Sequence, residues 1–223
     1  MPPTSPFITP HTLCEALDLS CVRARNSEYF VGKKSLNGDI TEIPYNDIAN
    51  SETYEGRQIV RSYASGHVFI SSDWAQVYLI TTLRDGRTQY QFTGGSPLEE
   101  TNTQVFAIQG GRVQIQRDKV EENAQIRTYN RTGVIVTSHF NDLPLVDWVL
   151  MESFDASWVP IWKLVCLMHY IVESYDGVLG FCLGVEQVVG GGWYDINTLE
   201  SFEGVSPNAA IVIQKALEII QDQ

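Results

Sequence analysis

Phe92-Thr-Gly-Gly-Ser-Pro-Leu-Glu-Glu100 is the segment around which the other predicted elements are arranged. Two strands are predicted at 76–83 and 89–92, because both segments are rich in β-branched and aromatic residues. The second strand ends at Phe92, the first residue of this segment. Between the two strands, Arg84-Asp-Gly-Arg87 contains an Asp-Gly pair, which is typical of a tight hairpin turn. The second strand therefore leads directly into two glycines and then two carboxylates.

The segment after Glu100 predicts a hairpin followed by a helix. Residues 104–116 alternate between apolar and polar on both sides of Gly110-Gly111, which indicates a two-stranded ribbon with a tight turn. A polar helix is predicted from residue 118 to about residue 132. Gly133 then occupies the position that favours a left-handed helix cap.

This predicted helix carries three acidic residues, Asp118, Glu121 and Glu122, at its start. Because positions three and four apart are neighbours on a helix, the three carboxylates share one face. Carboxylate oxygens grouped in this way are the ligands that Mg²⁺ or Mn²⁺ prefers. A metal held there would neutralise developing charge and lower the pKa of an attacking water molecule.

The composition limits the classes of function. The chain has 223 residues, of which 43% are hydrophobic and 19% charged, so it suits one large domain or a core domain with an extension. Its formal net charge of -12 argues against a nucleic-acid partner, and a small anionic ligand would need a metal ion or local arginines. The start of the sequence resembles no signal peptide, and no apolar run is long enough for a bilayer, so a cytoplasmic protein is expected.

The remaining segments predict a sheet with a terminal helix. Residues 1–65 are expected to form an extension with short strands and a short helix at 10–18. Further strands are predicted at 67–70, 134–136, 145–151, 161–172 and 178–183. Ser206-Pro207 is expected to open a helix, because Ser is a favoured N-cap and Pro a favoured first helical residue. Cys166 and Cys182 would face each other across a hairpin, but free thiols are the expectation.

The order of these features resembles the Nudix family, in which a hairpin delivers a Gly-Gly loop, an acidic residue and an acidic helix. Gly94 and Glu100 match the first part of the family motif, a Gly followed after five residues by a Glu. Segment 186–199 resembles the family's strand that ends in Trp-Phe/Tyr-Asp. The resemblance implies an α/β fold, an α/β/α sandwich with a mixed central sheet, over residues 66–223, with 104–116 as an inserted β-hairpin.

Two registers of the Nudix motif fit the helix, and both remain open. The first aligns Arg117-Asp-Lys-Val-Glu-Glu122 with the motif's Arg-Glu-x-x-Glu-Glu and keeps a metal site. The second is anchored on Ala124-x-x-Arg127 and on Gly133 as the end of the helix. In that register the carboxylate positions fall on Thr128 and Arg131, and the metal site is absent.

The resemblance implies a Mg²⁺-dependent (or Mn²⁺-dependent) pyrophosphohydrolase that acts on a nucleoside diphosphate linked to another moiety. Under the first register, Glu121 and Glu122 would be catalytic. The metal ligands would be Asp118, Glu121, Glu122, Glu100 and Glu186. The substrate-binding residues would be Gly94, Gly95, Arg127 and Arg131.

A second hypothesis follows from the second register and from the hairpin inserted within the motif. It is a degenerate Nudix fold that binds a nucleotide or a protein partner without hydrolysis. A homodimer formed by strand exchange through residues 1–65 is a further hypothesis, because the short strands there have no evident partners in their own segment. His169, on a long apolar segment, is expected to be a core histidine.

Overall fold

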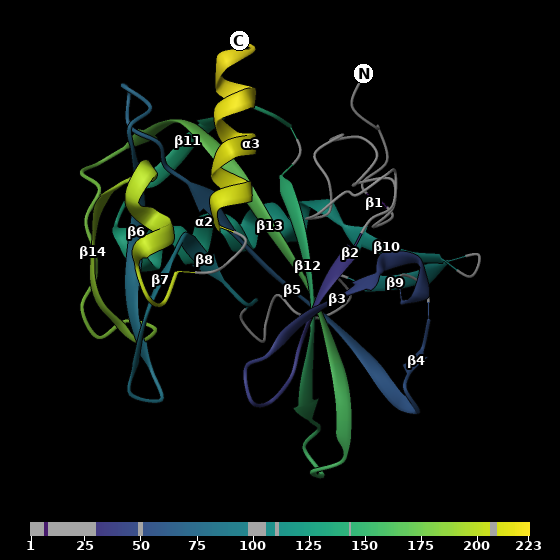
Figure 1. Ribbon diagram of the computed structural model, residues 1–223. Helices are drawn as coiled ribbons and strands as arrows, with labels where there is room; N and C mark the ends of the chain where they lie inside the picture. The colour runs from purple at the N-terminus through teal and green to yellow at the C-terminus, as the bar shows by residue number, and fades with distance from the viewer. Residues whose placement is uncertain are drawn as a thin grey trace. The chain divides into compact units, whose positions relative to one another are not determined.

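A computed structural model of the chain is shown in Figure 1. It describes residues 7–8, 30–48, 51–97, 106–109, 112–142, 144–205 and 209–223. The described residues form two compact units, one drawn from 1–64, 96–120 and 145–168, the other from 65–95, 121–144 and 169–223. The predicted helix at 10–18 and the predicted metal ligand Glu100 lie outside the described residues.

The first unit is built on a mixed sheet. Its strands are β2 Phe30–Lys34, β3 Ile40–Pro44, β4 Thr53–Tyr54, β12 Leu145–Phe154 and the first parts of β5 Arg57–Val68 and β13 Pro160–Asp176, whose ends belong to the second unit. They follow the order β3-β2-β12-β13-β5-β4. Strand β12 pairs parallel with β2, whereas β3 pairs antiparallel with β2. The predicted fold class, α/β with a mixed sheet, is confirmed by this arrangement.

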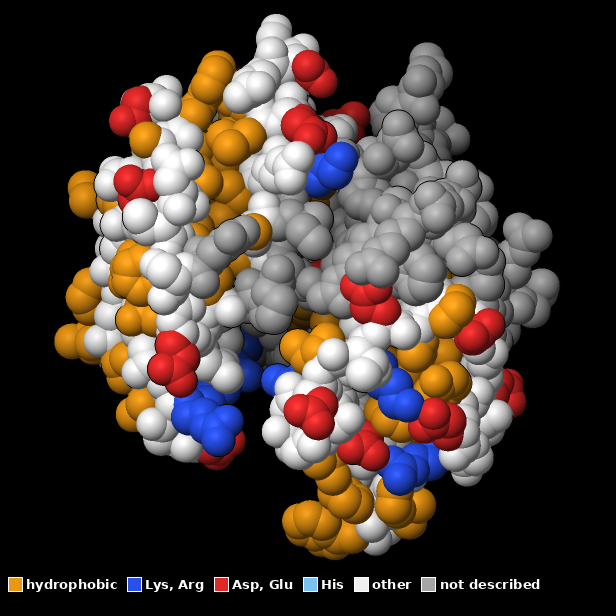
Figure 2. Space-filling view, in the orientation of Figure 1, with side chains coloured by type: hydrophobic (Ala, Val, Ile, Leu, Met, Phe, Trp, Pro, Cys, Tyr) orange, Lys and Arg blue, Asp and Glu red, His pale blue; other side chains and the backbone are white. Residues whose placement is uncertain are grey.

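The predicted hairpin that precedes the helix is present in the first unit. Its strands are β9 Phe106–Gln109 and β10 Arg112–Gln116, paired antiparallel with Arg112 opposite Gln109. A short strand, β1 Phe7–Ile8, adds to the outer side of β10. At the other hairpin of this unit, between β12 and β13, Phe154, Trp158 and Val159 are exposed, and Figure 2 shows that tip as a hydrophobic patch.

The second unit contains a three-stranded antiparallel sheet in the order β14-β6-β7, formed by β6 Gln76–Arg84, β7 Arg87–Gln91 and β14 Val188–Asp195. At the turn between β6 and β7, Asp85 and Gly86 both have positive φ, as the predicted Asp-Gly turn requires. Two further strands complete the unit: β8 Thr93–Gly95 pairs with the end of β5, and β11 Ile135–His139 pairs with the end of β13.

Two glycines allow β5 and β8 to approach each other more closely than ordinary strands do. Gly66 lies opposite Gly94, and a Cβ atom added to Gly66 would lie 1.7 Å from the carbonyl oxygen of Thr93. A Cβ atom on Gly94 would lie 2.5 Å from the carbonyl oxygen of Ser65, and its φ of +138° also disfavours other residues. The first glycine of the predicted loop is therefore required by strand packing.

Helix α2 Arg117–Thr132 confirms the predicted helix. It ends as expected at Gly133, which has a φ of +78° and donates its N–H to the carbonyl of Tyr129 at 2.8 Å. After β14, a 3-10 helix, η3 Ile196–Ser201, leads towards the terminal helix α3 Ala209–Gln221. No helix among the described residues is long and apolar enough to cross a membrane.

The prediction of a strand at 178–183 is wrong. This segment is irregular, and its backbone groups bind side chains and a helix end instead of a neighbouring strand. The hydroxyl of Tyr78 donates to the carbonyl of Gly180 at 2.6 Å, and the N–H of Cys182 donates to the carbonyl of Arg131 at 2.9 Å. Cys166 is buried in the first unit and Cys182 is half-buried in the second, and both are free thiols.

Candidate functional site

The inner face of helix α2 is polar. Thr128 and Arg131 are buried on it, about one and two helical turns beyond Ala124, which is also buried. These are the two positions that the second motif register assigns to carboxylates. Asp118 and Glu122, which the first register assigns to the metal, are exposed. The helix therefore turns threonine and arginine side chains, and few carboxylates, toward the interior of its unit.

A hydrogen-bonded network fixes Thr128. The Thr93 hydroxyl donates to the carbonyl of His67 at 3.1 Å, and its oxygen lies 2.9 Å from the Thr128 hydroxyl. The Thr128 hydroxyl in turn lies 2.7 Å from Nδ1 of His67. Each of these hydrogen bonds has one donor and one acceptor when Thr128 donates to Thr93 and the His67 Nδ1–H donates to Thr128. His67 is then a neutral imidazole, in agreement with burial that lowers its pKa to about 3.

The Gly-Gly segment contacts the same helix. Asn123 donates through Nδ2 to the hydroxyl of Ser65 at 2.9 Å and to the carbonyl of Gly95 at 3.1 Å. The guanidinium of Arg127 lies against the backbone of Gly95, because a Cβ atom added there would be 2.8 Å from Nη2 of Arg127. The structure therefore brings together three of the predicted substrate-binding residues, Gly94, Gly95 and Arg127.

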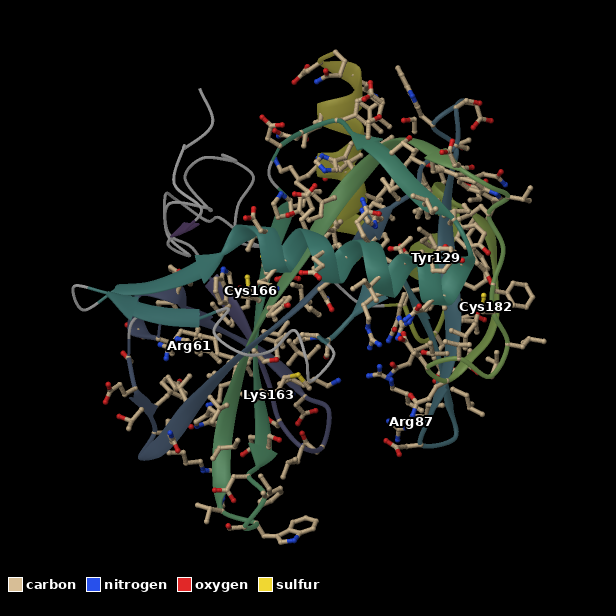
Figure 3. The ribbon with its side chains drawn as sticks, turned by 180° about the vertical axis from the view of Figure 1, so that it is seen from behind. Arg61, Arg87, Tyr129, Lys163, Cys166 and Cys182 are labelled. Carbon is tan, nitrogen blue, oxygen red and sulfur yellow. The ribbon has the colours of Figure 1, made fainter. Side chains whose placement is uncertain are left out.

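Three arginines converge on two neighbouring loop residues. Arg127 Nη1 and Arg131 Nε each donate to a different oxygen of Glu186, the latter at 2.7 Å. Arg84 Nε donates to the side-chain carbonyl of Gln187 at 3.1 Å. We call these five residues the arginine cluster. Figure 3 shows side-chain nitrogens gathered between the end of α2, near Tyr129, and the β6–β7 turn that carries Arg87.

Burial and charge set the character of the arginine cluster. The side chains of Arg131, Arg127 and Glu186 are 2%, 13% and 17% exposed. Burial lowers the pKa of Arg131, the hydrogen bond that Arg131 donates to Glu186 raises it, and the positive charges of Arg127 and Arg84 lower it again. The arginine cluster therefore contains three guanidinium groups but one carboxylate, which leaves a local excess of positive charge in a chain whose net charge is -12.

The predicted metal ligands are spread over different surroundings. Glu121 is 45% exposed and lies 3.4 Å from Nε2 of His139, a contact that raises the pKa of His139. Both oxygens of Glu186 accept hydrogen bonds from arginines, so the donor set around Glu186 does not fit Mg²⁺, which requires several oxygen ligands. Within the described part of the chain, no three His, Cys, Asp or Glu residues group as a metal site.

Arg84, Thr93 and His67 are the residues at this site that sequence reasoning missed. The sequence predicts only a turn at Arg84 and gives Thr93 no role beyond its place before the two glycines. The one available signal was the second register, which placed Thr128 and Arg131 where carboxylates are expected. A threonine and an arginine at these positions indicate that hydrogen-bond partners for both side chains must come from other elements of the fold.

No protein-family model and no curated protein matches the chain. Among solved structures, it is similar to a MutT structure from work on Aliivibrio salmonicida and Vibrio cholerae, at 17% identity over 71% of this chain and 99% of that one, with a TM-score of 0.41. A MutT Nudix hydrolase from Burkholderia pseudomallei is 13% identical over 70% and 98%, with a TM-score of 0.44. A Nudix hydrolase from Nitrosomonas europaea is 13% identical over 73% and 90%, with a TM-score of 0.42.

These neighbours belong to the class that the sequence resemblance predicted. At these identities and TM-scores, the likeness transfers no activity to this chain. What the protein does has to be argued from its own side chains.

The buried histidines predict a loss of stability in acid. Burial lowers the pKa of His169 to about 4, from an ordinary value of 6.5. The folded chain then keeps this imidazole neutral while the unfolded chain binds a proton, so the stability is complete above about pH 6.5 and is lost as the pH falls toward 4. For His169 alone, we expect a loss of about 2 kcal/mol between about pH 7.5 and about pH 5.

Urea unfolding at these two pH values measures this loss. The variant His169→Leu removes the titrating group from a site where the ring packs 4.9 Å from Phe92, centroid to centroid. Its free energy of unfolding should fall less over the same range than that of the wild type. Equal pH dependence in the two proteins would show that His169 does not contribute.

Proposed function

We propose that this chain is a Nudix-like protein that binds a phosphate-bearing, nucleotide-type ligand at the arginine cluster, without a divalent metal and without hydrolysing it. The observation that carries this proposal is the convergence of Arg127 and Arg131 on the carboxylate of Glu186, with Arg84 bound to the neighbouring Gln187. Guanidinium groups bind phosphate oxygens through paired N–H donors, so a phosphate ligand matches both the charge and the geometry of the cluster.

The local charge supports an anionic ligand. Figure 2 shows the Lys and Arg side chains of the viewed face in a few small groups, in a chain whose net charge is -12. The arginine cluster is therefore a local exception to the charge of the chain. Arg84 and Arg87 are exposed at the β6–β7 turn and extend the positive charge outward from it.

The hydrogen-bonding capacity of Arg127 points the same way. Its Nη1 donates to Glu186, but its Nε is buried and has no hydrogen-bond partner among the described residues. A buried donor without an acceptor is costly, and a phosphate oxygen would satisfy it. The Gly95 backbone supports the guanidinium from one side and has no Cβ atom to displace it.

Isothermal titration tests this proposal, with ADP and inorganic pyrophosphate as probes in a buffer that contains EDTA. Loss of a charge-assisted hydrogen bond costs about 1.5–3 kcal/mol, so Arg127→Met should weaken binding by roughly 10- to 100-fold. The matched control is Lys215→Met, which removes one positive charge from helix α3, where Lys215 pairs with Glu218. The control should bind as the wild type does. Wild-type protein that binds neither probe would contradict the proposal.

A metal-dependent pyrophosphohydrolase is the second candidate function, and one observation favours it. Asp118, Glu121 and Glu122 lie within one turn at the start of α2, and all three retain solvent exposure. With Glu100, which lies outside the described residues, they are four of the five carboxylates that the resemblance implies for Mg²⁺, and Glu186 is the fifth. Nucleotide hydrolysis that needs Mg²⁺ and is abolished in Glu122→Gln would establish this function and overturn the non-hydrolytic proposal.

A further inference from the structure

We propose that Glu186 is an internal competitor for the phosphate site: its carboxylate occupies Arg127 in the ligand-free chain and must leave before a phosphate can bind there. This inference rests on the proposed function, because it concerns the same arginine cluster. It goes further in two ways: the loop that carries Glu186 has to open, and Glu186 sets the affinity of the site for phosphate.

The two arginines that hold Glu186 differ in accessibility. Arg131, with 2% of its side chain exposed, donates to one carboxylate oxygen at 2.7 Å. Arg127, with 13% exposed, donates to the other oxygen and carries the Nε that has no partner among the described residues. An incoming phosphate therefore reaches Arg127 first, while Arg131 continues to neutralise Glu186. The contact that has to open is the one between Arg127 and Glu186.

The loop that carries Glu186 is under backbone strain. Glu186 and Gln187 are consecutive non-glycine residues with φ values of 51° and 66°, in the left-handed region that such residues rarely adopt. Side-chain contacts to Arg127, Arg131 and Arg84 hold this conformation, together with a hydrogen bond from the Leu83 N–H to the Gln187 carbonyl at 3.2 Å. Release of Glu186 from Arg127 removes one of these restraints and lets the strain relax.

In the closed state, the carboxylate of Glu186 occupies Arg127. This state reduces the affinity of the site for phosphate by a fixed factor. When only a fraction of the molecules has Arg127 available, the apparent dissociation constant is the intrinsic one divided by that fraction. The factor is a property of the protein and is the same for every ligand that uses Arg127. Removing the carboxylate of Glu186 should therefore tighten the binding of inorganic phosphate and of pyrophosphate by equal factors.

The experiment is isothermal titration of inorganic phosphate and pyrophosphate into the wild type, Glu186→Gln and Glu203→Gln. Glu203 is an exposed acid in the same unit, so its variant reproduces the change in net charge away from the cluster. We expect Glu186→Gln to bind both probes at least about fivefold more tightly, and by the same factor for each. Glu203→Gln should bind as the wild type does.

A second variant protects the test if Glu186→Gln folds poorly. Gln187→Ala removes the hydrogen bond from Arg84 but leaves every charge in place, so it weakens the closed loop while Arg127 and Arg131 keep their ion pairs with Glu186. It should tighten the binding of both probes about twofold. Hydrogen exchange gives a readout that does not depend on affinity: saturating pyrophosphate should accelerate exchange of the Leu83 amide in the wild type, because its acceptor is Gln187.

The outcomes distinguish a failure of this inference from a failure of the proposed phosphate-binding function. If neither the wild type nor Glu186→Gln binds a probe, the proposed function fails and this inference fails with it. If the wild type binds, but Glu186→Gln binds equally or more weakly and Leu83 becomes more protected, the arginine cluster is a binding site and Glu186 is part of it, not its competitor. Tighter binding in Glu186→Gln with faster exchange at Leu83 establishes the competitor.

Discussion

Replacing Gly66 by alanine is expected to lower the free energy of unfolding by more than about 3 kcal/mol, because the new methyl group overlaps backbone atoms that have no room to move. The added Cβ atom would lie 1.7 Å from the carbonyl oxygen of Thr93 and 2.7 Å from the Cα atom of Gly94. Relief requires β5 and β8 to separate. That movement would displace Thr93 from its hydrogen bond with Thr128.

Urea denaturation followed by circular dichroism measures this effect. Gly192→Ala is the matched control, since Gly192 also lies in a strand of the second unit but has no atom within 4 Å of the position of an added Cβ. Alanine is a slightly better strand residue than glycine, so the control should change stability by about 0.5 kcal/mol or less. A Gly66→Ala protein as stable as this control would mean that β5 and β8 are not packed backbone to backbone.

Replacing Arg131 by methionine is the second substitution for which a large loss of stability is expected, about 3 kcal/mol. The methionine keeps most of the aliphatic volume but removes the charge that is buried most deeply beside Glu186. Glu186, which is 17% exposed, then retains Arg127 alone, and the loss of one partner from a buried ion pair costs more than the net value of the pair.

A double-mutant cycle identifies the origin of that loss. Because the penalty arises from the carboxylate that is left behind, Arg131→Met combined with Glu186→Gln should cost less than the sum of the two single variants. Arg57→Met is the comparison at a more exposed ion pair, where the arginine side chain is 37% exposed and bonds Glu152 at 3.0 Å, and about 1 kcal/mol or less is expected. Additive costs at Arg131 and Glu186 would argue against direct coupling.

Local sequence signals were sufficient for most of the elements. The Asp-Gly pair predicted the β6–β7 turn, alternation predicted the β9–β10 hairpin, and Gly133 predicted the end of α2, because each of these depends on the backbone preferences of a few neighbouring residues. The failure at 178–183 has the opposite cause. Its apolar residues fit a strand pattern, but Tyr78 and Arg131, distant in sequence, bind its backbone groups.

The inner face of α2 could not be derived from the helix alone. Acidic residues at its start and polar residues toward its end both lie at helical spacing, so both motif registers satisfied the pattern. What distinguishes the two faces is the partner of each side chain. Thr128 bonds His67, 61 positions away, and Arg131 bonds Glu186, 55 positions away. Such contacts depend on the tertiary fold, and periodicity carries no information about them.

The contact between Gly95 and Arg127 has an evolutionary consequence. The arginine side chain rests on main-chain atoms, so the identity of residue 95 is limited by a residue on another element. A larger side chain there requires the guanidinium of Arg127 to move or to be lost. Positions 95 and 127 should therefore covary in an alignment of homologous sequences.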